Sequence, residues 1–178
     1  MNKSIQLINE NGVITWDELV VLVKNIPYGR NANRYDFSLV LTENKGTCSS
    51  KHSFLKDFAN KNNIQNVKLY IGMFKMNGTN TPKLGTFISD NNLHYIPEAH
   101  CYLKIDGIPV DVTTSESFYE KIESDILEEI EIQPEQVSDF KIEYHKKYLQ
   151  NWIKETNQTK SFDEIWSIRE KCIEKLAE

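Results

Sequence analysis

Hydrophobic residues at helical spacing mark the first predicted element of the chain. Thr15 and Glu18 have the spacing of a capping box, which indicates that a helix begins here. The apolar residues that follow lie on one side of this helix: Trp16, Leu19, Val20 and Val23. The turn-forming run Pro27-Tyr28-Gly29 ends it.

A second helix is predicted from about Cys48 to about Asn62. Gly46 interrupts the irregular stretch before it, and the hydroxyl of Thr47 can cap its N-terminus. The apolar face of this helix comprises Phe54, Leu55, Phe58 and Ala59. The pattern therefore predicts a helix that the chain enters directly from a tight glycine turn.

The middle of the chain changes to the pattern of β-strands. Residues 67–76 are rich in β-branched and aromatic side chains, and residues 99–105 and 108–113 form two further runs joined by Asp106-Gly107. An Asp-Gly pair between two such runs is one of the strongest local signals for a hairpin. Residues 77–94 have the composition of a loop.

The pattern of the last third of the chain predicts helices. Residues 115–130 are acidic and amphipathic, and Pro134 can start a helix that runs to about Thr156. Ser161 and Glu164 form another capping box before a third apolar stripe. Helices followed by strands and then helices predict an α+β fold with an antiparallel sheet.

Composition and length indicate one folded domain. The 178 residues are 39% hydrophobic and 26% charged, so the chain can bury a sizeable core. Because no linker or repeat divides the sequence, we expect a single domain over residues 1–178. Its core would span about 15–113, and a helical C-terminal part about 115–178.

Charge and cysteine usage narrow the class of protein further. A net charge of −5 without a basic stripe argues against binding to nucleic acid or to an anionic membrane surface. The sequence begins without the apolar region of a signal peptide and has no run long enough to span a membrane, so a cytoplasmic location is expected. In that reducing compartment, the cysteines at 48, 101 and 172 are expected to be free thiols.

Cys48 has the surroundings of a nucleophile. It falls in the first turn of its predicted helix, where unpaired N–H groups and the helix dipole stabilise an anion and can form part of an oxyanion hole. Lys45, Lys51 and His52 would add positive potential, which lowers the pKa of a thiol. The competing interpretation is a small buried core thiol.

The predicted hairpin places a base beside an acid. A two-residue turn at Asp106-Gly107 puts His100, Tyr102, Asp111 and Thr113 on one face of the sheet. His100 and Asp111 are then diagonal neighbours, with backbones separated by roughly 7–8 Å, a gap that their side chains can bridge. The carboxylate would hold one ring nitrogen and turn the other towards Cys48. Taken singly, His100 could also be an ordinary sheet histidine and Asp111 a solvated acid.

Other reactive residue types are expected to be structural. Cys101 should point to the opposite face from His100, into the core, and nothing marks Cys172 as reactive. His52 and His145 are expected to face solvent, and Glu98 to be a solvated loop acid.

Three segments together resemble the transglutaminase-like superfamily of papain-like cysteine enzymes. They are the glycine turn and cysteine helix at 46–52, the histidine strand at 98–102, and the aspartate strand at 110–113. The resemblance implies a cysteine-bearing helix packed on an antiparallel sheet, covers about residues 30–113, and leaves the additional C-terminal helices unaccounted for. Many members have a tryptophan shortly after the histidine, where this chain has Tyr102 and Leu103.

The resemblance also implies roles for residues. Cys48 would be the nucleophile, His100 the general base and acid, and Asp111 the group that orients the imidazole. The reaction would be acyl transfer or hydrolysis of an amide in a peptide, protein or small molecule, as in a protease, amidase, deamidase or transamidase. It would pass through a thioester and need no metal or organic cofactor. The further candidates for oxyanion or substrate contact are Asn33, Tyr102 and His52.

Two other classes of function stay open. Cys48 and His52 have a ligand-like spacing on a helix, and His100-Cys101 could complete a metal site, although adjacent strand residues point to opposite faces. The chain could also be a binding module that has the fold without the activity.

Overall fold

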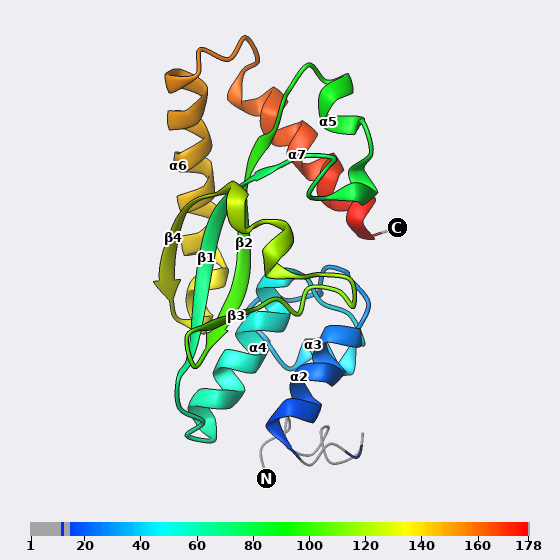
Figure 1. Ribbon diagram of the computed structural model, residues 1–178, viewed down its shortest axis with the longest axis vertical. Helices are drawn as coiled ribbons and strands as arrows, with labels where there is room; N and C mark the ends of the chain where they lie inside the picture. Colours follow the sequence, from blue (N-terminus) through cyan, green and yellow to red (C-terminus); the bar gives the residue numbers. More distant parts are fainter. Residues whose placement is uncertain (1–11, 13–14, 178) are drawn as a thin grey trace.

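The structure is a computed structural model that describes residue 12 and residues 15–177. It is an α+β fold with a four-stranded antiparallel sheet in the strand order β3-β2-β1-β4 (Figure 1). The strands are β1 (Val67–Met76), β2 (Ile96–Ile105), β3 (Ile108–Val110) and β4 (Ile126–Ile132). The expected α+β class with an antiparallel sheet is thus confirmed.

The predicted hairpin forms between β2 and β3, but its second strand is short. Asp106 and Gly107 both adopt positive φ, 50° and 84°, as a two-residue turn of this kind requires. Ile105 then pairs with Ile108, the register expected from the sequence. The strand ends at Val110, before residue 113; there the Asp111 side chain accepts a hydrogen bond from the Thr113 N–H two residues on, as in a local turn.

The prediction of a helix over residues 115–130 is wrong. Two short 3-10 turns, η2 (Tyr119–Lys121) and η3 (Glu123–Asp125), lead into strand β4, which pairs with β1 at the sheet edge. The acidic side chains of β4 find basic and phenolic partners on β1, β2 and α6, as in the Lys68–Glu131 ion pair at 2.9 Å. Cross-strand pairing of this kind outweighs the helical pattern of the segment.

The helices match the sequence expectations more closely. They are α2 (Trp16–Asn25), α3 (Leu39–Thr42), α4 (Cys48–Lys61), α5 (Phe87–Asp90), α6 (Asp139–Glu155) and α7 (Phe162–Ala177). The capping box of Thr15 and Glu18 forms at the start of α2, and that of Ser161 and Glu164 precedes α7. The helix expected from Pro134 begins as a 3-10 turn, η4 (Pro134–Val137), and continues as α6 after Ser138.

Two hydrophobic clusters hold these elements together. The first joins α2 and α4 to one face of the sheet, which presents Leu69, Ile71 and Met73 of β1 beside Cys101 and Leu103 of β2. The second joins the other ends of β1 and β2 to α5, α6 and α7, which gather in the upper part of Figure 1. Within the described residues, no helix is both long and apolar enough to cross a bilayer.

The short β3 decides where a site can form. It pairs only with residues 103–105 of β2, so the stretch of β2 around His100 has no strand neighbour on that side. The first turn of α4 and the segment after β3 fill this gap. Side chains from both faces of β2 can therefore meet at its edge.

Candidate active site

Cys48 is the first residue of α4, as the sequence predicts. The backbone N–H of Thr47 donates to the Ser50 hydroxyl at 2.9 Å, and the Thr47 hydroxyl accepts from the Ser50 N–H at 3.4 Å. In this reciprocal cap, the N–H of Ser50 is already hydrogen-bonded and is not available to a substrate. The N–H groups of Cys48 and Ser49 lie in the first turn, where the helix itself offers no acceptor.

Gly46 permits the tight turn that places Cys48 at the start of α4. A Cβ at this position would lie 2.7 Å from Lys51 Cγ and 3.1 Å from Ser50 Oγ. Lys51 cannot move aside freely because it is fully buried and its ammonium donates to the carbonyls of Ile26 and Thr113. Burial lowers the pKa of Lys51 to about 8. Lys51 thus ties the start of α4 to the neighbouring segments and does not face the thiol, contrary to the expectation.

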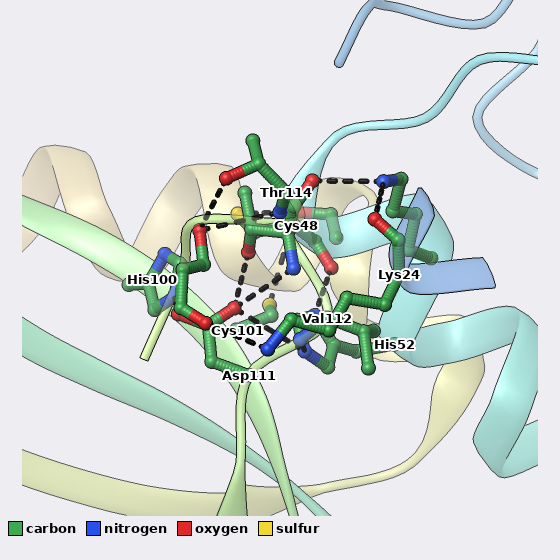
Figure 2. A network of polar contacts seen from close by, with 12 residues as sticks. Lys24, Cys48, His52, His100, Cys101, Asp111, Val112 and Thr114 are labelled. Carbon is green, nitrogen blue, oxygen red and sulfur yellow. Dashed lines mark hydrogen bonds and ion pairs between the residues drawn. The ribbon is translucent and has the colours of Figure 1, made fainter. Parts of the chain in front are cut away.

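His100 and Asp111 are in direct contact (Figure 2). Nε2 of His100 lies 2.9 Å from Oδ2 of Asp111. The other carboxylate oxygen accepts from the Thr113 N–H at 2.9 Å and from the Thr113 hydroxyl at 2.6 Å. Burial would raise the pKa of Asp111, but the charge and hydrogen bond of His100 hold it well below its ordinary value. The carboxylate is therefore ionised and fixes the orientation of the imidazole.

The imidazole also lies close enough to Cys48 for each group to shift the pKa of the other. Burial disfavours the imidazolium, but the charges of Asp111 and Cys48 together raise the pKa of His100 to about 10. The pKa of Cys48 is lowered well below its ordinary value, by a hydrogen bond from Cys101 first, and against burial by the charges of Lys141 and His100. The structure thus brings Cys48, His100 and Asp111 together, with a thiolate and an imidazolium as the favoured charge state.

Cys101 lies in the core, as expected, yet it also reaches the site. Its sulfur is 3.8 Å from the Ser49 hydroxyl, and it contributes most to the lowered pKa of Cys48. His100 and Cys101 are neighbours in β2, yet both are close enough to Cys48 to shift the pKa of its thiol. The pKa of Cys101 is raised well above its ordinary value by the interaction with Cys48 and by burial, so Cys101 is the protonated member of the pair.

The expectation that His52 faces solvent is wrong. His52 is fully buried, with Nδ1 2.6 Å from the Cys48 carbonyl and Nε2 2.9 Å from the backbone N of Val112. The Val112 N–H donates to Nε2, so Nδ1 carries the proton. Burial lowers the pKa of His52 to about 4, which keeps it neutral. His52 joins the cysteine helix to the residue after Asp111 and cannot contact a substrate, contrary to the suggestion from the sequence.

A lysine of α6 supplies the positive charge beside Cys48. Nζ of Lys141 lies 3.7 Å from Cys48 Sγ and 2.6 Å from the Ser49 hydroxyl, and its side chain is buried. Burial would lower the pKa of Lys141, but the two sulfurs and Glu98 raise it above its ordinary value. Nothing in the sequence marks this residue beyond its basic position within the amphipathic pattern of a distant helix.

Glu98 and His145 are also buried, contrary to the expectation that both are solvated. Glu98 accepts hydrogen bonds from two nitrogens of Arg169 on α7, at 2.7 and 2.5 Å. His145 of α6 lies 2.8 Å from the Pro97 carbonyl, next to Glu98. These contacts fix α6 and α7 against the end of β2, and so determine where Lys141 stands.

The structure does not bring Asn33 or Tyr102 into contact with a substrate site. Asn33 is exposed, and its side-chain oxygen accepts from the Tyr35 N–H at 3.0 Å. Tyr102 is fully buried, its hydroxyl donates to Glu129, and its ring packs beside the imidazole of His100 with centroids 6.5 Å apart. Both suggestions from the sequence are therefore corrected.

Two cavities meet at Cys48. The first, which we call the basic cavity, has a volume of about 280 Å³ and lies between the first turn of α4 and helices α6 and α7; its walls include Thr47, Ser49, Lys141 and Arg169. The second, which we call the apolar cavity, has a volume of about 610 Å³, and its walls include Phe74, His100, Asp111, Phe118 and Leu176. Cys48, Tyr28, Glu98 and Ile173 border both. A molecule bound at the sulfur can therefore extend in two chemically different directions.

The metal alternative has no supporting geometry. Among the residues that the structure describes, no group of three or more histidine, cysteine, aspartate or glutamate side chains is arranged to hold an ion.

Comparisons of the chain with protein-family models, with curated proteins and with solved structures find no match. The resemblance to the transglutaminase-like superfamily therefore stays a prediction from the sequence, and the chemistry of the site has to be argued from its own geometry.

Proposed function

We propose that this protein is a cysteine hydrolase or acyltransferase of the transglutaminase-like kind that cleaves an amide through a thioester on Cys48. The observation that carries the proposal is the hydrogen bond of 2.9 Å between His100 and Asp111, beside a Cys48 whose pKa the charge of His100 lowers. A nucleophile, a base and a group that orients the base are what such catalysis requires. The cysteine helix packed against an antiparallel sheet is consistent with the same assignment.

In the first half of the reaction, the thiolate of Cys48 attacks the carbonyl carbon of the amide. A C–S bond forms, and the carbonyl electron pair moves to the oxygen. The N–H groups at positions 48 and 49 and the nearby ammonium of Lys141 stabilise this oxyanion. The C–N bond then breaks as the imidazolium of His100 gives its proton to the leaving amine.

In the second half, a water or an amine attacks the thioester carbonyl. His100, now neutral, takes a proton from the attacking molecule, and the C–S bond breaks to restore the thiolate. Asp111 keeps the imidazole in position throughout. Every one of these steps uses groups of this chain and the two reactants.

Acyl-adduct formation tests the proposal directly. We expect incubation of the protein with a library of activated amides and esters to give an acyl adduct on Cys48, detected by intact mass and mapped by peptide mass spectrometry. Hydroxylamine should release it, as expected for a thioester. Cys172 is an internal control, because burial raises the pKa of its thiol to about 11. A Cys48 that accepts no acyl group and alkylates as slowly as Cys172 at pH 6 would indicate an inert binding module.

Lys141→Met is expected to raise the pKa of the Cys48 thiol by about one to three pH units, because an opposite charge a few ångströms from the sulfur is removed. Alkylation of Cys48 by iodoacetamide should then slow at pH 6 and change little at pH 9, as measured by the pH dependence of the rate. Lys141→Arg preserves the charge and should retain fast alkylation at pH 6. An unchanged profile in Lys141→Met would show that the lysine does not stabilise the thiolate.

A further inference from the structure

The basic cavity has a charge opposite to that of the whole chain. The chain carries a net charge of −5. The cavity nevertheless has five basic side chains in its walls, against the two carboxylates of Glu98 and Glu170: Arg30, Arg34, Lys141, Lys146 and Arg169. Such a local excess is typical of a site that receives an anion.

Three of the five cations are available to a ligand. Arg169 is paired with both Glu98 and Glu170, and Arg30 is paired with Glu170 at 2.7 Å. Within residues 15–177, the structure records ion pairs for neither Arg34 nor Lys146, both of which are exposed; the Lys146 ammonium lies over the Trp166 ring, 5.4 Å from its centroid. Lys141 lies at the inner end beside Cys48, with two of its three ammonium protons directed to Ser49 and Cys48. The cavity thus offers cations from its mouth to the reacting sulfur.

The position of the general acid decides which part of a substrate lies in each cavity. His100 borders the apolar cavity and not the basic one. Because the leaving amine must receive its proton from His100, the amine part of the substrate lies on the apolar side. The first turn of α4, which carries the oxyanion donors, lines the basic cavity. The acyl part, joined to the same carbonyl carbon as the oxyanion, therefore extends into the basic cavity.

We propose that the acyl part of the substrate carries a carboxylate, which binds in the basic cavity to Arg34 and Lys146. This inference rests on the proposed function, since it assigns the two cavities by the direction of acyl transfer. A volume of about 280 Å³ restricts the acyl group to a short one, and the larger apolar cavity accepts a bulky apolar amine. The substrate class is thus an amide between a short acidic acyl group and an apolar amine.

A matched pair of amides tests the proposal. Glutaryl-7-amino-4-methylcoumarin bears a free carboxylate, and its carboxamide analogue has nearly the same shape without the charge. Since both release the same amine, the ratio of their kcat/KM values reports on the acyl side alone. We expect the anionic amide to be preferred about tenfold or more, as for a charge-assisted hydrogen bond, with the preference decreasing at high salt. A ratio near one while both amides are cleaved would overturn this proposal and leave the proposed function standing.

Variants identify the residues responsible. Arg34→Gln and Lys146→Gln should each lower the preference for the anionic amide. Lys147→Gln is the matched control, because Lys147 is the next residue of α6, is equally exposed and lies outside both cavities. An equal loss in Lys147→Gln would show that the preference arises from net charge and not from the cavity.

A binding measurement separates this proposal from the proposed function. Free glutarate should slow the alkylation of Cys48 by iodoacetamide in the wild-type protein more than glutaramide does, and Arg34→Gln should reduce this protection. If no amide is cleaved but glutarate still protects Cys48, the basic cavity binds carboxylates and the proposed chemistry fails. If glutarate gives no more protection than glutaramide, the carboxylate site is refuted.

Discussion

Cys48→Ala is expected to abolish turnover of any amide that acylates the wild-type protein. The alanine side chain has no atom that can attack the carbonyl carbon, and the thioester that divides the reaction into two steps cannot form. His100 and Asp111, which contact each other directly, and Lys141 supply a base, an acid and a charge but no thiol, so the remaining groups have no covalent route to the product. The measurement is the rate of amine release under multiple-turnover conditions, together with the loss of the acyl adduct from the intact mass.

The other two cysteines provide matched controls for that substitution. Cys172 belongs to the second hydrophobic cluster, away from the sulfur of Cys48, so Cys172→Ala should retain turnover. Cys101→Ala should retain a reduced turnover, because the hydrogen bond that contributes most to the low pKa of Cys48 is lost while the nucleophile remains. Turnover that persists in Cys48→Ala would mean that another residue is the nucleophile, and the proposed mechanism would be wrong.

Local signals in the sequence were sufficient to predict the elements that carry Cys48 and His100. Thr47 and the glycine before it specify where α4 begins, and Asp106-Gly107 specifies the turn that sets the register of His100. Both are short-range effects, in which a side chain or a positive φ determines the backbone within a few residues. The meeting of His100 with Asp111 could therefore be inferred before any tertiary contact was known.

Interactions between distant segments could not be inferred in the same way. Residues 126–132 form a strand because they pair with the open edge of β1, where Lys68 meets Glu131. His52 is buried because the segment after β3 crosses over α4, and Lys141 reaches the sulfur because Glu98 and Arg169 fix α6 and α7 in place. In each case the deciding partner lies far away in the sequence, where periodicity carries no information.

The C-terminal helices, which the family resemblance leaves unexplained, therefore belong to the site. Lys141 of α6 contacts Cys48, Arg169 of α7 holds the buried Glu98, and the end of α7 lines the apolar cavity. A search restricted to the three motif-bearing segments would find Cys48 and His100 but miss the positive charge beside them.

His100→Ala is expected to lower kcat/KM by about 10²–10⁴-fold, the usual contribution of general acid–base catalysis. Two effects combine in this variant. The leaving amine loses its proton donor, and the pKa of Cys48 rises because the neighbouring imidazolium charge is gone. Alkylation of Cys48 at pH 6 should consequently also slow, although this reaction needs no proton transfer to a leaving group. Loss of turnover with unchanged alkylation would indicate that His100 acts only as the acid.

The pH profile distinguishes a catalytic imidazole from one that merely supports the fold. Turnover requires an ionised Cys48 and a protonated His100, so the wild-type profile should fall on the basic side near pH 10, the pKa of His100 in the pair. Asp111→Asn removes the charge that most strongly favours the imidazolium, so the pKa of His100 should fall and the basic limb should move to lower pH. Since an asparagine preserves the size of the side chain, a lower rate with an unshifted limb would contradict the assignment of Asp111. A shifted limb is a change that a purely structural role for these two residues cannot produce.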